Sequence, residues 1–358
     1  MSTILIMAGG TGGHVFPALA VAHELRKQGA QVVWLGTRAG IEARVVPAAG
    51  LDIEYVSIQS LRGGGLLRWL LLPLRLNLAM LQSLRILRRR QPDAVLAMGG
   101  FAAGPGALMA SFLRIPLIVH EQNAIAGLTN RWLVQLADRV LCGFPGAFGD
   151  RHGVRVVGNP VRPEILALST PDMRFAGREG RLRLLIVGGS QGARVFNETL
   201  PAALRLLSEA ARPQVWHQTG ARDAMRVAAD YREFLPEAKV SAFIDDMAAA
   251  YAWADLVVCR AGAMTVAELA AAGVGAILVP LPTAADDHQT ANARFLAERD
   301  AAVLLPQSEC TADRLAEMIN DVAANRAMLA RMAINARGGA VTDATEVVAR
   351  ECLEAAAP

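Results

Sequence analysis

Two glycine-rich loops contain the residues best suited to bind a phosphate group. The first, Gly9-Gly10-Thr11-Gly12-Gly13-His14, follows an apolar run at 3–6 and precedes a helical pattern at 18–27. The second, Gly188-Gly189-Ser190-Gln191-Gly192-Ala193-Arg194, also joins a strand pattern to a helix pattern. Backbone N–H groups at a helix N-terminus, reached through residues without Cβ, form an anion site. The pair predicts a nucleotide or diphosphate ligand, although such turns also occur in doubly wound folds without a phosphate.

The spacing of the glycines argues against a dinucleotide cofactor. The NAD pattern is G-x-G-x-x-G, and Val15 stands where its third glycine belongs. The pattern also needs an acid at the end of the second strand, and the corresponding runs end at Gly36-Thr37 and Thr219-Gly220. We therefore expect no dehydrogenase and no cofactor.

Further candidate groups follow other strand patterns. The glycine-rich run 98–106 and the tetrad His120-Glu121-Gln122-Asn123 lie in the first half, and the run 259–268 lies in the second. Glu268 has two interpretations. With Thr265 it fits a helix capping box, or its carboxylate could accept both hydroxyls of a ribose. Asp286 and Asp287 lack a third ligand nearby in the sequence, so we expect no metal site.

These residues require an alternating α/β chain to position them. Helical patterns separate thirteen strand candidates, and this alternation predicts two open, doubly wound parallel sheets with ligands at the strand ends. The strand candidates are residues 3–8, 31–36, 53–57, 94–98, 117–120, 139–142, 154–157, 182–187, 214–218, 240–243, 256–259, 276–279 and 303–305. The run Gly158-Asn159-Pro160-Val161-Arg162-Pro163 breaks the pattern and predicts a domain boundary.

Composition narrows the function classes. A length of 358 residues suits two domains. A net charge of +3 and few aromatic residues argue against nucleic acid as a partner. The four cysteines are scattered, which predicts reduced thiols rather than a disulfide framework or a zinc site. Because the first residues already form a core strand pattern, we expect no signal peptide.

Residues 61–90 form a basic, leucine-rich segment that includes Trp69 and no acid. Such a segment suits the surface of an anionic bilayer and is too charged to span it. For residues 77–90 alone, we favour an ordinary crossover helix with a solvated basic face. For residues 63–74, which are more apolar, we expect membrane contact.

Taken together, these motifs resemble the MurG family, the bacterial UDP-N-acetylglucosamine–N-acetylmuramyl-(pentapeptide) pyrophosphoryl-undecaprenol N-acetylglucosaminyltransferases. The resemblance rests on the runs 9–17, 120–123, 158–162 and 188–194 and on Thr265-Val266 with Glu268. It implies the GT-B architecture, with two Rossmann-like domains and the sugar nucleotide between them. We expect an N-terminal acceptor domain at 1–160, a C-terminal UDP-GlcNAc domain at 164–335, and a final segment, 336–358, packing back on the first domain.

The resemblance also implies roles for individual residues. His14 is the first candidate for the general base, and Glu121 is the alternative. His14 could instead make a hydrogen bond to the acceptor phosphate or cap its own loop. Gly100 and Gly104 are expected near the pyrophosphate of the acceptor. The expected UDP-GlcNAc contacts are Thr11, Gly12, Gly13, Asn123, Arg162, Ser190, Ile244, Ala263, Met264, Thr265, Val266, Ala267, Glu268 and Gln289.

The expected function is inverting transfer of GlcNAc to the undecaprenyl-linked muramyl-pentapeptide, at the cytoplasmic face of the bacterial inner membrane. The expected partners are UDP-GlcNAc, the lipid acceptor, an anionic membrane surface and a cell-wall synthesis complex. Two other classes remain open at this point. A UDP-GlcNAc 2-epimerase would share the fold and the donor, and a non-catalytic scaffold would need no turnover.

Overall fold

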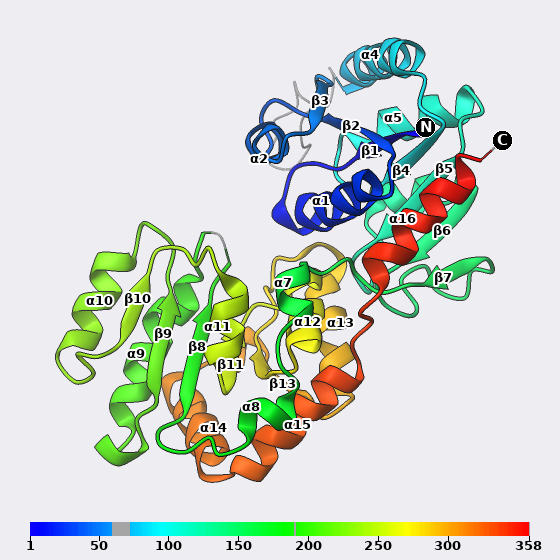
Figure 1. Cartoon of the computed structure of the whole chain (residues 1–358). Coiled ribbons are helices and arrows are strands. Elements are labelled where there is room, and N and C mark those ends of the chain that lie inside the picture. The colour runs from blue at the N-terminus through cyan, green and yellow to red at the C-terminus, as the bar shows by residue number, and fades with distance from the viewer. Residues whose placement is uncertain (59–71, 190, 358) are drawn as a thin grey trace. The chain divides into compact units, whose positions relative to one another are not determined.

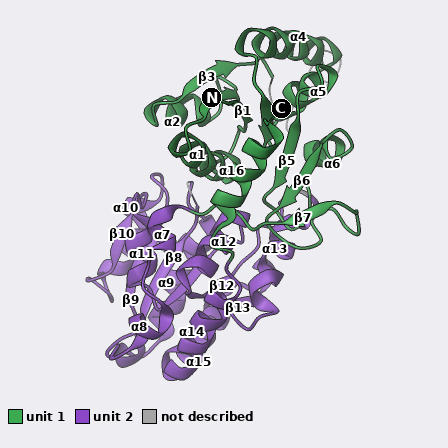
Figure 2. Ribbon diagram, turned by 45° about the vertical axis from the view of Figure 1, so that its right-hand side comes forward, with its two compact units in different colours: residues 1–161, 341–358 green, residues 162–340 purple. Residues whose placement is uncertain are grey.

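The computed structural model describes residues 1–58, 72–189 and 191–357. The chain forms two compact units (Figure 2). Unit 1 comprises residues 1–161 and 341–358, and unit 2 comprises residues 162–340. The C-terminal residues therefore return to the unit that contains the N-terminus. None of the helices in the described part of the chain is both long and apolar enough to cross a bilayer.

Unit 1 is built on a parallel seven-stranded sheet in the order β3-β2-β1-β4-β5-β6-β7 (Figure 1). Its strands are β1 (Thr3–Met7), β2 (Gln31–Gly36), β3 (Asp52–Tyr55), β4 (Ala94–Ala97), β5 (Leu117–Glu121), β6 (Arg139–Cys142) and β7 (Val154–Val156). Strand β4, at the centre of the sheet, is apolar and buried along its whole length because helices cover both faces of the sheet.

Successive side chains of each strand enter two separate cores. Ile4 and Ile6 of β1 pack toward α1 (Gly12–Lys27) and α16 (Ala344–Ala355), whereas Leu5 and Met7 pack toward α5 (Ala103–Phe112). The other helices are α2 (Glu42–Ala48), α4 (Leu72–Arg90) and α6 (Leu128–Leu133). Glu351 holds α16 against the sheet by pairing with Arg139 and Arg155.

Unit 2 contains a parallel six-stranded sheet in the order β10-β9-β8-β11-β12-β13. Its strands are β8 (Arg183–Val187), β9 (Gln214–Gln218), β10 (Lys239–Ser241), β11 (Leu256–Cys259), β12 (Gly275–Leu278) and β13 (Ala302–Leu304). Its helices are α7 (Pro163–Leu166), α8 (Pro171–Phe175), α9 (Arg194–Leu206), α10 (Ala224–Arg232), α11 (Met247–Trp253), α12 (Ala263–Ala272), α13 (His288–Ala297), α14 (Ala312–Ala324) and α15 (Arg326–Gly338). Short 3-10 turns occur at Glu209–Ala211, Ala285–Asp287 and Gln307–Glu309.

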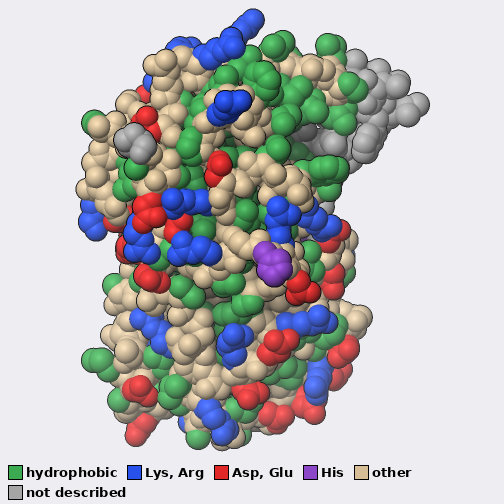
Figure 3. All heavy atoms as spheres, turned by 90° about the vertical axis from the view of Figure 1, so that its right-hand side faces the viewer, with side chains coloured by type: hydrophobic (Ala, Val, Ile, Leu, Met, Phe, Trp, Pro, Cys, Tyr) green, Lys and Arg blue, Asp and Glu red, His purple; other side chains and the backbone are tan. Residues whose placement is uncertain are grey.

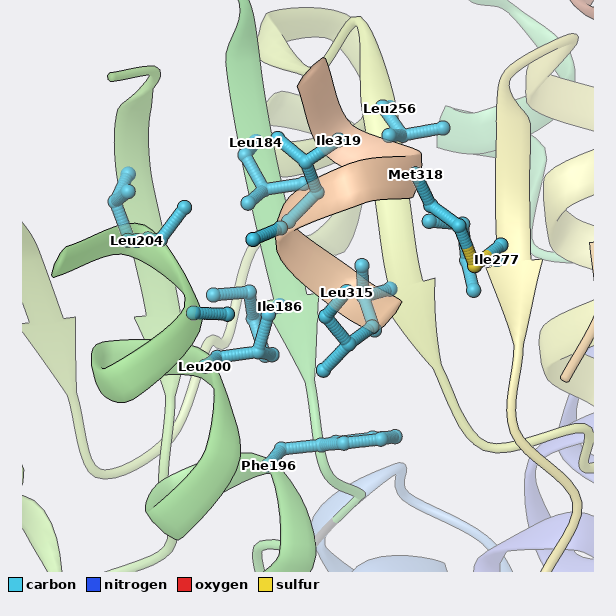
Figure 4. Packing of buried hydrophobic residues seen from close by; sticks show 14 of the residues in the cluster. Leu184, Ile186, Phe196, Leu200, Leu204, Leu256, Ile277, Leu315, Met318 and Ile319 are labelled. Carbon is cyan, nitrogen blue, oxygen red and sulfur yellow. The ribbon is translucent and has the colours of Figure 1, made fainter. Parts of the chain in front are cut away.

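A well-packed core covers one face of this second sheet. Figure 4 shows Leu200 of α9 and Leu315 and Ile319 of α14 gathered around Leu184 and Ile186 of β8. All five side chains are fully buried. This packing fixes the start of α9, and therefore the glycine loop that precedes it.

The same strand order recurs in both sheets, and it places the glycine loops. In each sheet the first strand lies between the second strand and the fourth, so the connections leave in opposite directions at that point. A crevice forms there at the carboxyl ends of the strands, and open α/β sheets bind ligands in it. It lies after β1 and β4 in unit 1 and after β8 and β11 in unit 2. The predicted α/β class and all thirteen strands are confirmed, with strand ends within two residues of expectation.

Candidate active site

In unit 1 the loops after β1 and β4 are packed directly against each other. The Met98 N–H donates to the Met7 carbonyl at 2.9 Å, joining the two strand ends. Gly100 has φ +86°, and a Cβ there would overlap the Gly9 carbonyl and lie 3.1 Å from the Gly9 nitrogen. The glycine at 100 is therefore required by loop packing, and this close approach brings the two predicted ligand loops together.

A buried carboxylate braces the first glycine loop. Glu42, at the start of α2, is fully buried, and its Oε2 accepts a hydrogen bond from the Gly10 N–H at 3.0 Å. Its Oε1 accepts from the N–H and the hydroxyl of Thr37, at 2.9 and 2.8 Å. A Cβ on Gly9, Gly36 or Gly40 would collide with this side chain. Sequence reasoning missed Glu42, because its partners lie on two different strand ends.

His14 lies in the first turn of α1, with its ring against the second loop. A Cβ added to Gly99 would lie 2.9 Å from Cε1 and Nδ1 of the ring, so the ring occupies the space that a side chain at 99 would need. Nδ1 is 2.8 Å from the side-chain oxygen of Gln122. Among the described residues, this is the hydrogen bond that holds the half-buried imidazole in place.

Gln122 connects His14 to a second, buried histidine. The Gln122 Nε2 lies 3.1 Å from Nδ1 of His120 and 3.2 Å from the His120 carbonyl. The His120 Nε2 lies 3.0 Å from the Gly158 carbonyl. Burial lowers the pKa of His120 to about 4, although the Gly158 carbonyl and the charge of Glu121 act in the opposite direction. His120 is therefore neutral at physiological pH.

The carboxylate of Glu121 is enclosed by four donors. It accepts from the backbone and side-chain N–H groups of Asn123 at 2.9 and 3.0 Å, from the Gly127 N–H at 3.0 Å and from Asn130 Nδ2 at 2.9 Å. The residue is 1% exposed. This network fixes the loop after β5 and leaves Glu121 in a structural position.

The remaining unit 1 candidates lie at helix starts. Thr11 is the N-cap of α1 and makes no side-chain capping bond, and Gly12 and Gly13 are its first helical residues. Gly104 is the second residue of α5. Because the first N–H groups of a helix have no partner within the helix, both helix starts can donate to an anion.

In unit 2 the loop after β8 depends on glycines in the same way. A Cβ on Gly192, at φ +74°, would overlap the Thr219 carbonyl, and one on Gly220, at φ +80°, would overlap the Gln191 carbonyl. The side chain of Gln218 donates to the Gly189 carbonyl at 2.8 Å. This packing holds the loop against the end of β9. Ser190, the predicted diphosphate contact, lies outside the described residues.

Glu268 forms an ion pair rather than a helix cap. The N-cap of α12 is Gly262, three residues before Thr265, so the capping-box interpretation is wrong. The Glu268 Oε1 accepts from Nε and Nη2 of Arg162 at 3.1 and 2.8 Å, and its Oε2 accepts from the Tyr251 hydroxyl at 3.3 Å. Burial raises the pKa of Glu268, and the Arg162 guanidinium opposes that rise. Tyr251 carries no sequence signal and was not expected.

The other unit 2 candidates surround the same strand ends. Ile244 is buried in the loop that precedes α11. Gln289 lies in the first turn of α13, and its side-chain oxygen accepts from the Leu281 N–H at 2.9 Å. The remaining predicted contacts occupy the first five positions of α12: Ala263, Met264, Thr265, Val266 and Ala267. Apart from Arg162 and Glu268, which pair with each other, the described candidates thus lie at strand ends, or in loops or helix starts that follow strands.

Two further observations concern metal and thiol chemistry. Within residues 1–58, 72–189 and 191–357, no three His, Cys, Asp or Glu side chains are grouped as metal ligands. The four cysteines are free and buried. Burial raises the pKa of the Cys259 thiol to about 12, so this thiol stays protonated at neutral pH.

Comparison with known proteins identifies the family. The Glycosyltransferase family 28 N-terminal domain matches residues 4–142, and the Glycosyltransferase family 28 C-terminal domain matches residues 183–348. A protein of Nitrosococcus oceani named UDP-N-acetylglucosamine–N-acetylmuramyl-(pentapeptide) pyrophosphoryl-undecaprenol N-acetylglucosamine transferase is 55% identical, over 99% of this chain and 98% of its own length.

Solved structures resemble this chain at two levels, one in both sequence and fold and the other in fold alone. The crystal structure of Acinetobacter baumannii MurG is 41% identical, covers 99% of this chain and 100% of its own, and superposes with a TM-score of 0.87. A UDP-GlcNAc 2-epimerase from Neisseria meningitidis reaches a TM-score of 0.68, covering 99% of this chain and 100% of its own. Its identity is only 12%, so this likeness shows the GT-B fold alone. The chain therefore belongs to the MurG family of glycosyltransferases.

Proposed function

We propose that this chain transfers GlcNAc from UDP-GlcNAc to undecaprenyl-pyrophosphoryl-MurNAc-pentapeptide. The observation that carries the proposal is the full-length similarity to transferases bearing that name. The arrangement at the strand ends of both units supports it, because each unit presents glycine-lined backbone where a phosphate can approach.

Unit 2 would hold the donor. The carboxylate of Glu268, fixed by Arg162 and Tyr251, would accept the ribose hydroxyls, and the backbone of Ile244 would contact the uracil. Ser190 would contact the diphosphate. The first turn of α12 would direct its N–H groups at the departing UDP, whose charge develops as the bond to the sugar breaks.

Gln289 has a more restricted role than its residue type alone implies. Its side-chain oxygen already accepts from the Leu281 N–H. Its amide NH₂ group would therefore donate to hydroxyls of the GlcNAc ring. A donor at this position fits a sugar hydroxyl acting as acceptor.

Unit 1 would hold the acceptor and the transferred sugar. Gly100 and Gly104, beside the start of α5, would meet the acceptor pyrophosphate. The start of α1, formed by Thr11, Gly12 and Gly13, would close over the sugar together with Asn123. At Gly13 and Gly104 the missing Cβ lets phosphate oxygens approach the backbone, whereas the same space at Gly100 is filled by Gly9.

His14 rather than Glu121 would serve as the general base. The Glu121 carboxylate is engaged by four hydrogen bonds in the buried interior, whereas the His14 ring is half-buried. In an inverting displacement the muramyl hydroxyl attacks the anomeric carbon as the bond to UDP breaks, and the hydroxyl proton passes to imidazole.

The chain would work at the cytoplasmic face of the inner membrane, with α4 contacting anionic lipid. Leu74, Leu78 and Leu81 follow helical spacing along one exposed stripe that continues to Arg85, and Phe112 of the neighbouring α5 is 71% exposed. Figure 3 shows hydrophobic side chains gathered over part of unit 1, with basic side chains at the margin. This combination suits insertion into the headgroup region.

The structure describes only residues 72–90 of the predicted membrane segment, and the two ends of this stretch differ. Residues 61–71, including Leu70 and Leu71, lie outside the described residues. Toward the end of α4, Ile86 and Leu87 are buried in the core, and Arg89 and Arg90 pair with Glu54. This end is an ordinary crossover helix, so the proposed membrane contact is limited to the earlier turns.

Vesicle sedimentation tests the membrane contact. Replacing Leu74, Leu78 and Leu81 by serine should weaken binding to vesicles containing anionic lipid. Added salt should weaken the binding of the wild-type chain to the same vesicles. The control variant replaces three exposed apolar residues of unit 2 by serine: Met173, Leu206 and Met225. Equal binding by the two triple variants would contradict the proposal.

A transfer assay tests the activity. Incubation with labelled UDP-GlcNAc and a short-chain lipid acceptor should yield the disaccharide lipid, with and without a chelator. Conversion of UDP-GlcNAc without any acceptor would indicate the epimerase class instead. Full activity of a folded Glu268→Ala variant would contradict the donor assignment, and a complete lack of transfer would support a scaffold.

A further inference from the structure

We propose that Gln122 fixes the tautomer of His14, with the proton on Nδ1 and the lone pair on Nε2. The inference deepens the proposed function, since it assigns a positioning residue and a reacting atom to the base. It depends on a row of hydrogen bonds that runs from the Gly158 carbonyl through His120 and Gln122 to His14. Two backbone carbonyls, which can only accept, set the direction of the row.

The first carbonyl fixes the tautomer of His120. Its Nε2 lies 3.0 Å from the Gly158 carbonyl oxygen, so Nε2 must carry a proton and donate. Because burial keeps this imidazole neutral, its Nδ1 is bare and accepts. The amide of Asn159, next in the chain, donates to the Gln122 carbonyl at 3.0 Å and holds the two segments in register.

The second carbonyl fixes the orientation of the Gln122 amide. One end of the amide lies 3.2 Å from the His120 carbonyl and 3.1 Å from the bare Nδ1 of His120. Both of these groups accept, so the NH₂ group must occupy that end. A flipped amide would instead place its oxygen against two acceptors, the His120 carbonyl and the bare Nδ1 of His120.

The Gln122 oxygen therefore faces His14, where it requires a donor. The distance from this oxygen to His14 Nδ1 is 2.8 Å. Nδ1 must carry the proton, and in the neutral ring Nε2 then bears the lone pair. A ring protonated at Nε2 would still donate from Nδ1, so accepting the substrate proton requires no rearrangement of the row.

The surroundings make Gln122 the group that decides the tautomer. Gly99 also lies beside Cε1 and Nδ1 of the ring, and it offers no side chain that could donate or accept. The two acids of the adjoining loops are engaged elsewhere: Glu121 bonds within its own loop, and Glu42 bonds to Gly10 and Thr37. An uncharged amide thus orients the base.

Nitrogen NMR of the ¹⁵N-histidine-labelled full chain tests the inference without reference to activity. The chain has six histidines, and His14 is assigned as the signal missing from a His14→Asn variant. In its neutral form, wild-type His14 should show a protonated Nδ1 and a bare Nε2. A proton on Nε2 in the wild type would overturn the proposal, and the tautomer itself is read from the wild-type chain.

Two matched variants extend the test. Gln122→Met keeps the side-chain length but removes both the amide oxygen and the NH₂ group. It should produce a mixture of His14 tautomers. Gln28→Met makes the same change at the exposed far end of α1 and should leave the His14 spectrum unchanged. An unchanged single tautomer in a folded Gln122→Met variant would refute the role of Gln122.

Kinetics separate this inference from the proposed function. With UDP-GlcNAc and lipid acceptor, Gln122→Met should lower kcat about tenfold, equivalent to about 1.4 kcal/mol, with KM for the donor unchanged. Equal losses from both Met variants would contradict a specific role for Gln122. A wild-type chain that showed the predicted tautomer but transferred no sugar would refute the proposed function and leave the tautomer assignment standing.

Discussion

Replacing Glu42 by glutamine should loosen the glycine loop that carries His14. The carboxylate serves three donors, with Oε1 facing the N–H and hydroxyl of Thr37 and Oε2 facing the Gly10 N–H. Glutamine has the same shape but only one accepting atom at that end. If its oxygen keeps both bonds to Thr37, its NH₂ group must face the Gly10 N–H, and two donors then oppose each other.

The size of the effect follows from burial. Glu42 is fully buried, so water cannot replace the lost acceptor. Loss of a hydrogen bond to a charged group, leaving an unsatisfied N–H, costs about 2–3 kcal/mol of unfolding free energy. For a unit of this size the loss corresponds to a fall in Tm of about 4–12 °C.

Hydrogen exchange provides the local assay. In the Glu42→Gln variant the amides of Gly10 and Thr37 should exchange faster, while the strands of unit 2 keep their protection. The kcat/KM for the lipid acceptor should fall about 10- to 100-fold, because a displaced loop misplaces the reacting groups. The affinity for UDP alone should stay unchanged, because the proposed UDP contacts lie in unit 2.

A matched control keeps the result interpretable. Glu354→Gln makes the same change on α16, where the side chain is 53% exposed and its ion pair with Arg139 is worth about 0–1 kcal/mol. It should leave stability and acceptor kinetics near wild type. If Glu42→Gln matched Glu354→Gln in both stability and acceptor kinetics, Glu42 would not be needed to hold the glycine loop in place, and the prediction would be wrong.

Three further predictions concern loop packing and the donor site. Gly100→Ala should cost about 2–4 kcal/mol of stability, since the new Cβ overlaps the neighbouring loop, whereas Gly153→Ala, also at positive φ but in open space, should cost about 1 kcal/mol. Chemical denaturation compares the two, and equal costs would contradict the packing argument. Burial raises the pKa of Glu268, so this carboxylate gains a proton at a higher pH than an ordinary glutamate does. UDP affinity should therefore start to fall at that higher pH as the solution is acidified, because protonation removes the charge of Glu268. Calorimetry should find this pH dependence absent in Glu268→Gln. Tyr251→Phe should weaken UDP binding about two- to tenfold by removing one donor to Glu268, and unchanged affinity would argue against that contact.

The sequence was sufficient to predict the α/β class and the strands. Buried parallel strands are short apolar runs, such as residues 94–97, and they stand out between helical patterns. The glycine loops were also visible, because a strand entering a helix through glycines is a local feature. The roles of Gly100 and Gly192 in close packing could not be predicted from the sequence. A Cβ at either position would collide with a loop that follows a different strand.

Glu268 shows the limit of local reasoning. Thr265 and Glu268 have the spacing of a capping box, and that pattern describes a helix start that the tertiary structure does not use. The packing of α12 starts the helix at Ala263 and leaves Glu268 to face Arg162 and Tyr251. A residue can cap a helix only at its first residues, and in the structure α12 begins at Ala263 rather than after Thr265.

Sequence alone determined which residues could do chemistry, because residue type and local spacing fix the available groups. Only the tertiary structure decided how those groups are oriented. Gln122 lies 108 positions from His14, and Glu42 lies 32 positions from Gly10. Strand order brings each pair into contact, and hydrogen-bond direction then depends on backbone carbonyls that carry no signal in the residue types.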